Sequence, residues 1–375
     1  MPAPESTNLN PASRTRRRII QIALAALALA LFTWAAILAK QQLDTVNETT
    51  GQTGWQDLRN AGLPRVALLL ALSATSVLMN GLMWWLAIRP VRQLPLGRTI
   101  GANAIATLLS FIPMKPSVIF RALFHKRADN LPILQLGGWA VAMGALLIAG
   151  LAPPVALALI LPATQAELWW ILAPTTVIAS AIAGTFISRF LATGPGWRAF
   201  EQLTTRLFKQ SGQRAINSDA FKNLHSGIFM LARFPTTVGG SALRFIDGLN
   251  YGARFYIAAS ILGLDLGFAQ GVVFGMTFFL IGVFSPIGAF GIRELITGFV
   301  LSKLTAADNG FAVTVFVQAI EMIAVLALAA IAAACMHKSI RQALSPTQKP
   351  TPKPEPEHPQ TPENHPNQPS EHPTD

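Results

Sequence analysis

The sequence predicts an all-α fold: a polytopic bundle of about eight transmembrane helices with one or two re-entrant or broken segments. Hydrophobic residues make up 51% of the 375 residues and charged residues only 13%, whereas soluble domains are roughly a quarter charged. The apolar residues also form continuous runs instead of an alternating pattern. Because a backbone in lipid must satisfy its own hydrogen bonds, continuous runs favour helices over a β-barrel.

Eight apolar runs carry the predicted spans. The first four and the eighth are clear, whereas the fifth to seventh could include a half-membrane hairpin. We expect the third to bend at Pro153 and Pro154. The runs cover residues 19–39, 66–88, 133–161, 168–187, 240–264 and 268–284, a seventh span that ends at 304, and 311–335.

The basic residues lie between these runs and give the chain a net charge of +11. They fall before the first span, between the second and third, between the fourth and fifth, and after the eighth. This alternation predicts a multi-pass protein of a bacterial-type inner (plasma) membrane, with both termini in the cytoplasm. Since the basic residues have this orienting role, we expect no nucleic-acid partner.

Composition divides the chain into three parts: a basic cytoplasmic N-terminus, a membrane domain, and a disordered Pro-rich cytoplasmic tail. These parts are residues 1–18, 19–340 and 341–375. Frequent proline in the tail opposes helix and sheet. Three tail histidines could form at most a loose metal site, namely His358, His365 and His372. We expect a low-complexity tail, and no metal or cofactor.

Polar residues inside apolar runs are the first candidates for a site. Arg244, Asp247 and Arg254 interrupt the fifth run. They could line a polar path with Glu321 of the eighth span, or the fifth span could begin later and leave them in the cytoplasm. Glu321 itself should face the bundle interior, protonated or paired with an arginine. Two asparagines are expected to hydrogen-bond between helices rather than to bind a ligand: Asn80 and Asn103.

Two segments break the apolar pattern in a similar way: "NAIATLLSFIPMKPSVIFRALFHK" and "FGMTFFLIGVFSPIGAFGIRELIT". Each has an apolar lead-in, then Pro113 or Pro286, then Arg121 or Arg293. Residues 100–113, which lead into the first break, are too few to span comfortably and fit a re-entrant segment. The similarity of the two segments is slight and hints at two related halves of four spans.

Such breaks suit a phosphate-binding site. A broken helix exposes free N–H groups that favour anions, and an arginine beside it can bind phosphate through two hydrogen bonds. Two ordinary alternatives remain. Arg293 and Glu294 could lie in a turn that faces water, and Arg121 could belong to a basic cytoplasmic segment.

With these motifs the chain resembles the membrane domain of lysylphosphatidylglycerol synthases, a flippase-like family that also occurs as stand-alone inner-membrane proteins. The resemblance covers about residues 15–340. The stretch "SPIGAFGIRE" is similar to the family's Pro–x–Gly–Gly–x–Gly–x–Arg–Glu pattern, and "NAIATLLSFIPMKPSVIFRALFHKRADNLPI" is similar to its Asn–Pro–basic–Gly–acid–Arg pattern. The positions that match the first pattern are Pro286, Gly288, Gly291, Arg293 and Glu294.

The chain also departs from the family. Pro116 and Ser117 stand where the family usually has Gly and an acid, and Ala289 stands where a second Gly is usual. Glu321 occupies a position where such proteins often have Arg. These departures could mean a different substrate or a lost transport activity. Because only the tail follows the eighth span here, the resemblance does not imply lysyl transfer to phosphatidylglycerol.

The resemblance implies binding or translocation of an anionic phospholipid or lipid-linked headgroup. Arg293 and Arg121 would bind phosphate, while Glu294 or Glu321 would orient an arginine or recognise a cationic group of the lipid. The candidate substrate-binding residues are Arg293, Glu294, Arg121, Glu321 and Lys115. The candidate break residues are Pro113, Pro116, Pro286, Gly288 and Gly291.

Other function classes remain as alternatives. The runner-up is a non-transporting scaffold or accessory subunit for a lipid-modifying or cell-envelope enzyme, which would dock through the basic loop at 188–235 or through the tail. A small-solute transporter is the third interpretation. No GxSxG, HExxH, CxxC or P-loop pattern is present, so no catalysis is expected.

Overall fold

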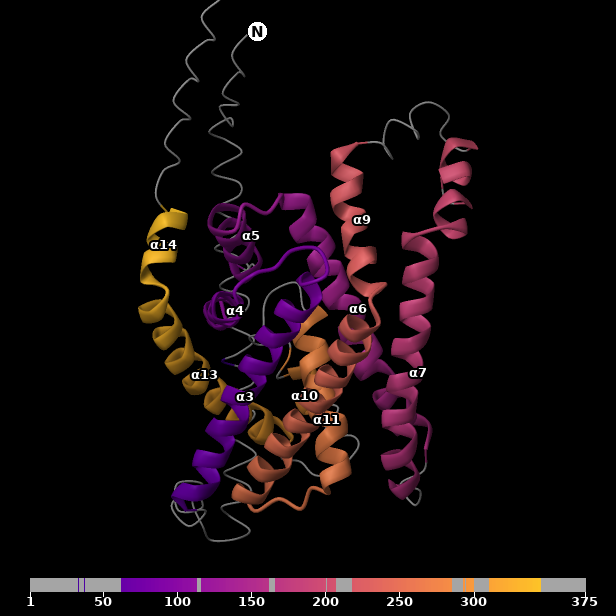
Figure 1. Cartoon of the computed structure of the whole chain (residues 1–375). Helices are drawn as coiled ribbons and strands as arrows, with labels where there is room; N and C mark the ends of the chain where they lie inside the picture. Colours follow the sequence, from indigo (N-terminus) through magenta and orange to yellow (C-terminus); the bar gives the residue numbers. More distant parts are fainter. Residues whose placement is uncertain are drawn as a thin grey trace, which may run out of the picture.

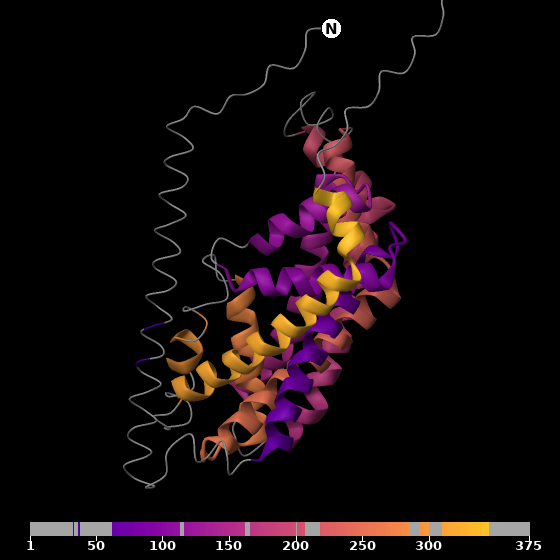
Figure 2. The ribbon, with the colours of Figure 1, turned by 90° about the vertical axis from the view of Figure 1, so that its left-hand side faces the viewer.

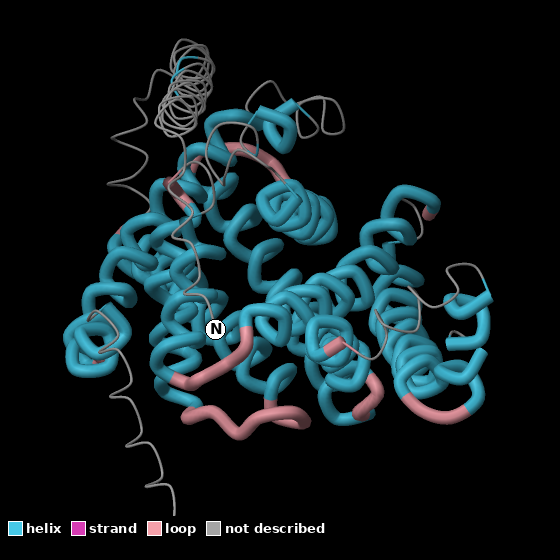
Figure 3. The backbone as a smooth tube through the Cα atoms, turned by 90° about the horizontal axis from the view of Figure 1, so that it is seen from above, coloured by secondary structure: helices cyan, strands magenta, loops and turns pink. Residues whose placement is uncertain are grey.

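The described part of the chain is all helical. The computed structural model describes residues 62–112, 116–161, 166–199, 201–206, 218–284, 295–299 and 310–344, together with residues 33, 37 and 293. Within these ranges the secondary structure is helix and loop without strand (Figure 3), which confirms the predicted fold class. Nearly all of the first predicted span, most of the seventh, the basic N-terminus and the tail beyond 344 lie outside the described residues.

The helices follow the predicted spans closely. They are α3 (Leu63–Ile88), α4 (Leu96–Ser110), α5 (Pro116–Ala128), α6 (Ile133–Ile160), α7 (Ala166–Ala192), α9 (Asp219–Leu231), α10 (Phe234–Ile261), α11 (Phe268–Phe284), α13 (Gly310–Cys335) and α14 (His337–Leu344). Among the described residues, four helices are long and apolar enough to cross a membrane. These four, α3, α6, α7 and α13, are the predicted second, third, fourth and eighth spans.

The remaining long helix, α10, runs through the middle of the bundle (Figure 1) and packs against α3, α6, α7, α11 and α13. It has 28 residues but carries three charged side chains, so it is less apolar than the other long helices. It begins at Phe234, before the predicted start at 240. The three charged side chains are buried inside the bundle, and the helix that carries them begins earlier than predicted, not later.

Close approach of two backbones fixes α11 against α10. A Cβ atom added at Gly275 would lie 2.5 Å from the backbone carbon of Tyr251, and one at Gly252 would lie 2.5 Å from the Cα of Val272. Only glycine fits where helices approach this closely. The spacing of Gly248 with Gly252, and of Gly271 with Gly275, is the small-xxx-small pattern of membrane helix pairs.

The first broken segment forms two short helices. α4 has 15 residues and α5 has 13, and Figure 2 shows them lying across the direction of the long helices. Pro116 is the first residue of α5, a position where a missing N–H costs nothing. This pair of helices is the arrangement expected for a re-entrant segment, and it brings the start of α5 into the interior of the bundle.

Candidate functional site

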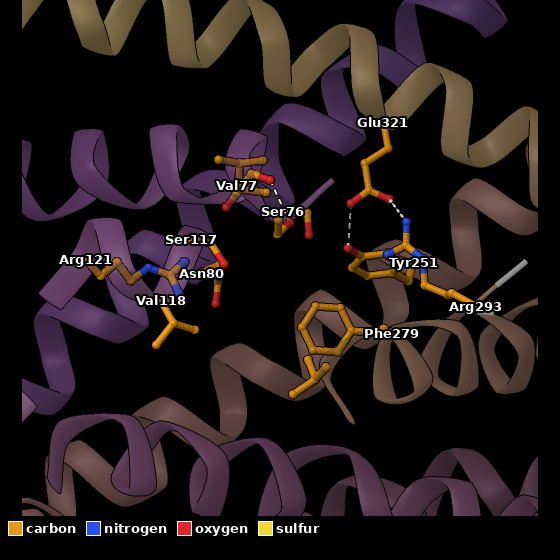
Figure 4. A pocket seen from close by; sticks show the side chains of 14 residues that line it. Ser76, Val77, Asn80, Ser117, Val118, Arg121, Tyr251, Phe279, Arg293 and Glu321 are labelled. Carbon is orange, nitrogen blue, oxygen red and sulfur yellow. Dashed lines mark hydrogen bonds and ion pairs between the residues drawn. The ribbon is translucent and has the colours of Figure 1, made fainter. Parts of the chain in front are cut away.

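A cavity of about 240 Å³ with both polar and apolar walls lies where α3, α4, α5, α10, α11 and α13 meet. We call it the central cavity (Figure 4). Hydroxyl, amide and charged side chains contribute to its wall alongside apolar ones. The residues labelled there are Ser76, Val77, Asn80, Ser117, Val118, Arg121, Tyr251, Phe279, Arg293 and Glu321.

The two arginines of the broken segments both line this cavity, and they approach it from opposite sides (Figure 4). Arg121 comes from α5 on one side. Arg293 comes from the second broken segment on the other, together with Glu321 of α13. Residues 121 and 293 are far apart in sequence, so the fold, not local geometry, brings them to one space.

Arg121 is held by neutral partners. Its Nη2 donates to Oδ1 of Asn103 at 2.7 Å, and its guanidinium lies over the ring of Trp84 at 4.5 Å from the centroid. Its buried Nε has no hydrogen-bond partner. No carboxylate among the described residues pairs with it. The guanidinium therefore has no counter-charge among the described residues, and it borders a cavity in which an anion could supply one.

Arg293 has a different environment. The side chain is 5% exposed, and its guanidinium lies 3.8 Å from the centroid of Phe278. Its Nη2 lies 3.6 Å from Oε2 of Glu321. An arginine buried in this way is not part of a turn that faces water, so that alternative is wrong for Arg293.

Glu321 is the anionic centre of the site. Oε2 lies 3.7 Å from Nη1 of Arg254 as well as 3.6 Å from Arg293, and Oε1 accepts a hydrogen bond from the Tyr251 hydroxyl at 3.1 Å. The carboxylate is buried. This agrees with the expectation that Glu321 faces the interior and pairs with an arginine, and it explains why a carboxylate is tolerated there.

A chain of hydrogen bonds joins Arg121 to the charged residues of α10. Asn80 donates to Asn103 at 3.1 Å, and its own Oδ1 accepts from Nη2 of Arg244 at 2.9 Å. Arg244 in turn binds Asp247 at 2.9 Å. The asparagines therefore do bond between helices, as expected, but they also connect the two charged regions. The sequence prediction missed this connection.

Sequence reasoning also missed Tyr251. It is one of two tyrosines in the chain, and it donates to Glu321 while Arg254 lies over its ring at 3.5 Å. The sequence contained a pattern that could have indicated this residue. Position 251 shares a helix face with Asp247 and Arg254 because the spacings of four and three residues bring side chains together.

Several candidate residues lie outside the described part of the chain: Pro113, Lys115, Pro286, Gly288, Gly291 and Glu294. Of the positions that depart from the family pattern, Ser117 and Glu321 both line the central cavity. Among the described residues, no three His, Cys, Asp or Glu side chains are grouped so as to hold a metal ion.

A buried cluster anchors the end of α5 that lies away from the cavity. Asp129 accepts a hydrogen bond from His125 Nδ1 at 2.7 Å and from Arg98 Nη1 at 2.7 Å. Burial alone would raise the pKa of the Asp129 carboxyl, but the bonds from His125 and Arg98 outweigh it and hold the pKa below its ordinary value. The cluster ties α5 to α4 and so helps to fix Arg121.

Comparison with protein families identifies the fold's relatives. The family model described as lysylphosphatidylglycerol synthase TM region matches residues 18–329. The chain belongs to this family. It is therefore a membrane protein of a family associated with lipid handling. No curated protein and no solved structure matched the chain.

Proposed function

We propose that the protein binds an anionic phospholipid or lipid-linked headgroup in the central cavity and moves it across the membrane. The membrane is a bacterial-type inner membrane, with both termini of the chain in the cytoplasm. One observation carries the proposal: Arg121 and Arg293, from two separate broken segments, border a single cavity from opposite sides. A phosphate between them would receive hydrogen bonds from two directions.

The uneven pairing of the two arginines supports different roles. Arg293 is already close to a carboxylate at 3.6 Å, so Glu321 orients it and lowers the net charge on that side. Arg121 has only the neutral partners Asn103 and Trp84. We therefore assign the main phosphate contact to Arg121 and a second, weaker contact to Arg293.

The other polar groups of the cavity fit the same ligand. Ser117 lines it, and its hydroxyl can donate to a phosphate oxygen, whereas the hydroxyls of Ser76 and Ser110 already donate to Asp247 and to the Thr107 carbonyl. A charge at membrane depth is costly unless it is paired. An anion bound at Arg121 would remove that cost in the loaded state, and this gives the ligand a physical reason to bind.

The proposal is tested by lipid translocation in reconstituted vesicles. Phosphatidylglycerol with a fluorescent headgroup-side label is placed in both leaflets, and bleaching of the outer leaflet by an impermeant reductant reports exchange. Arg121→Ala and Arg293→Ala should both abolish protein-dependent exchange. Lys126→Ala is the matched control, because Lys126 is an exposed cation on the same helix as Arg121 and lines neither this cavity nor its neighbour.

Two results would overturn the proposal. The first is exchange at the wild-type rate in both arginine variants. The second is equal loss of exchange in Lys126→Ala, which would mean that any lost cation on α5 has the same effect. Each variant is compared with the wild type by its thermal midpoint in detergent, so that a failure to fold is distinguished from a loss of transport.

A further inference from the structure

A second cavity, of about 430 Å³, adjoins the central cavity. We call it the side groove. Its walls are mainly apolar and come from α3, α5, α6, α10 and α11; they include Trp84, Leu136, Trp139, Met143 and Leu147. The two cavities share five lining residues, which are Asn80, Val118, Arg121, Phe279 and Val283. Arg121 therefore lies at the junction of the two spaces, of which the central cavity has the more polar wall.

The side groove reaches the outside of the bundle along one face of α6. Ile133, Gly137, Ala140 and Gly144 line it, and spacings of four, three and four residues place them on a single helix face. Ile133 is 55% exposed, and Gly137 and Ala140 are also exposed. Because α6 is a candidate membrane span, this face meets lipid chains, not water.

Two glycines keep this face open. A Cβ atom added at Gly137 or Gly144 would meet nothing within 4 Å. Gly150 on the same helix is different, because a Cβ there would lie 2.8 Å from the Cβ of Arg244. Glycine weakens a helix relative to alanine, and packing does not require it at 137 or 144. Their small size leaves space that a ligand can fill.

The polar side chains at the edge of the groove are mostly committed elsewhere. His125 is bonded to Asp129 at 2.7 Å. Arg244 is bonded to Asp247 and to Asn80, both at 2.9 Å. Arg121, by contrast, donates to the neutral Asn103 and has no carboxylate partner among the described residues. A headgroup would find few donors inside the groove, whereas an apolar chain would meet the aromatic and aliphatic wall.

We infer that the side groove takes one acyl chain of the lipid whose phosphate lies at Arg121. This inference rests on the proposed function and adds the place of the lipid's apolar part: at least one long chain remains inside the protein while the phosphate is bound. The exposed face of α6 is the lateral entrance for that chain. A soluble phosphate ester without a chain should bind weakly, since it would leave the groove empty.

The test uses phosphatidylglycerol with a photoreactive diazirine near the end of one acyl chain, in vesicles of phosphatidylcholine. Cross-linked positions are read by peptide mass spectrometry as the ratio of adducts at Met143 to adducts at Ile148. Met143 is buried in the groove wall, whereas Ile148 is 51% exposed on the same helix and reports labelling by bulk lipid. Phosphatidylcholine with the same chain is the comparison probe.

The wild type should give a higher Met143 to Ile148 ratio with phosphatidylglycerol than with phosphatidylcholine. Gly144→Leu, which fills the groove, should lower the ratio to the phosphatidylcholine level. Ala140→Trp, at the open side, is a second blocking variant in case the first folds poorly. Gly97→Leu is the control, because a Cβ at Gly97 also meets nothing within 4 Å but the residue is exposed and lines neither cavity.

The outcomes separate the two proposals. An equal ratio for both lipids, unchanged in Gly144→Leu and Ala140→Trp, would overturn the groove assignment. If Arg121→Ala still abolished transport in that case, the proposed function would stand without it. If the Met143 to Ile148 ratio were higher for phosphatidylglycerol, as expected, but Arg121→Ala left transport unchanged, chain binding in the groove would be supported and the headgroup site at Arg121 would be overturned.

Discussion

The charge of Glu321 should be a main contributor to the stability of the described bundle, and Glu321→Gln tests this directly. The substitution keeps the size of the side chain and an oxygen that can accept the Tyr251 hydrogen bond, which is 3.1 Å long in the structure. It removes only the negative charge. Two buried guanidinium groups, 3.6 and 3.7 Å from the carboxylate, then lose the counter-charge of Glu321.

The magnitude follows from these contacts. At 4 Å, a pair of unit charges attract by about 4 kcal/mol in a medium of intermediate dielectric constant, and desolvation of the pair offsets much of this. Removing one partner from a buried pair leaves the other charge uncompensated, which destabilises proteins by about 3–5 kcal/mol. We expect Glu321→Gln to lower the free energy of unfolding by an amount in this range. The hydrogen bond from Tyr251, worth about 1 kcal/mol, is retained in the variant and does not contribute to the loss.

The assay is equilibrium unfolding of the purified protein in mixed micelles, with Gln318→Leu as the matched control. Gln318 lies on the same helix and is 1% exposed, but neither of its side-chain polar atoms has a hydrogen-bond partner among the described residues. Replacing such a group by an apolar one should be neutral or stabilising. If Glu321→Gln lost less than about 1 kcal/mol, the level of an exposed ion pair, our reasoning on the charge centre would be refuted.

Three further predictions test other parts of the account. The folded-state pKa of Asp129 lies below its unfolded value, so its stabilising contribution is present above the unfolded pKa and is lost as pH falls through the folded pKa. Asp129→Asn should therefore lower the thermal midpoint at neutral pH and make the midpoint fall less steeply as the pH is lowered. If the midpoints of the variant and the wild type fell in parallel in acid, this prediction would be contradicted. Ser117→Asp places a carboxylate four residues before Arg121 on the cavity wall, where it competes with the phosphate for the guanidinium. Phosphatidylglycerol binding, measured by native mass spectrometry, should weaken about tenfold or more, since the competing charge pair is worth at least about 1.4 kcal/mol. Unchanged affinity would argue against a phosphate at Arg121. Gly275→Ala must move the backbone of α10 and should lower the free energy of unfolding by about 1–3 kcal/mol. Gly144→Ala meets open space and should raise the free energy of unfolding by up to about 1 kcal/mol. If both substitutions changed the free energy of unfolding in the same direction, the packing argument would be refuted.

Much of the fold could be predicted from the sequence because lipid leaves few choices for the backbone. Long apolar runs gave α3, α6, α7 and α13 nearly at their observed bounds. The charged run that became α10 was harder to predict, since hydropathy alone cannot tell a buried polar network from a cytoplasmic segment. Its partners on α3 and α13 lie more than sixty residues away in sequence, so only the tertiary structure reveals that the charges are compensated.

The candidate site, like the fold, could be predicted from the sequence only in part. Arg121 and Arg293 could be selected from the sequence because each follows a proline-broken apolar run, and a charge there is costly. Their convergence on one cavity could not be derived, because α5 is oriented by the Asp129 cluster and by the bond to Asn103. The side groove had no sequence signal at all. Gly137 and Gly144 look like ordinary helix glycines until the space beside them is known.

The central claim is that Arg121 and Arg293 hold the same anionic headgroup. A double-mutant cycle on phosphatidylglycerol binding, measured by native mass spectrometry with Arg121→Ala, Arg293→Ala and the double variant, tests this most directly. Each single variant should weaken binding about 10- to 100-fold, as expected for a charged hydrogen bond of about 1.5–3 kcal/mol, and the double variant should lose less than the sum because both contacts serve one phosphate. Additive losses, or wild-type affinity in Arg121→Ala, would contradict the claim.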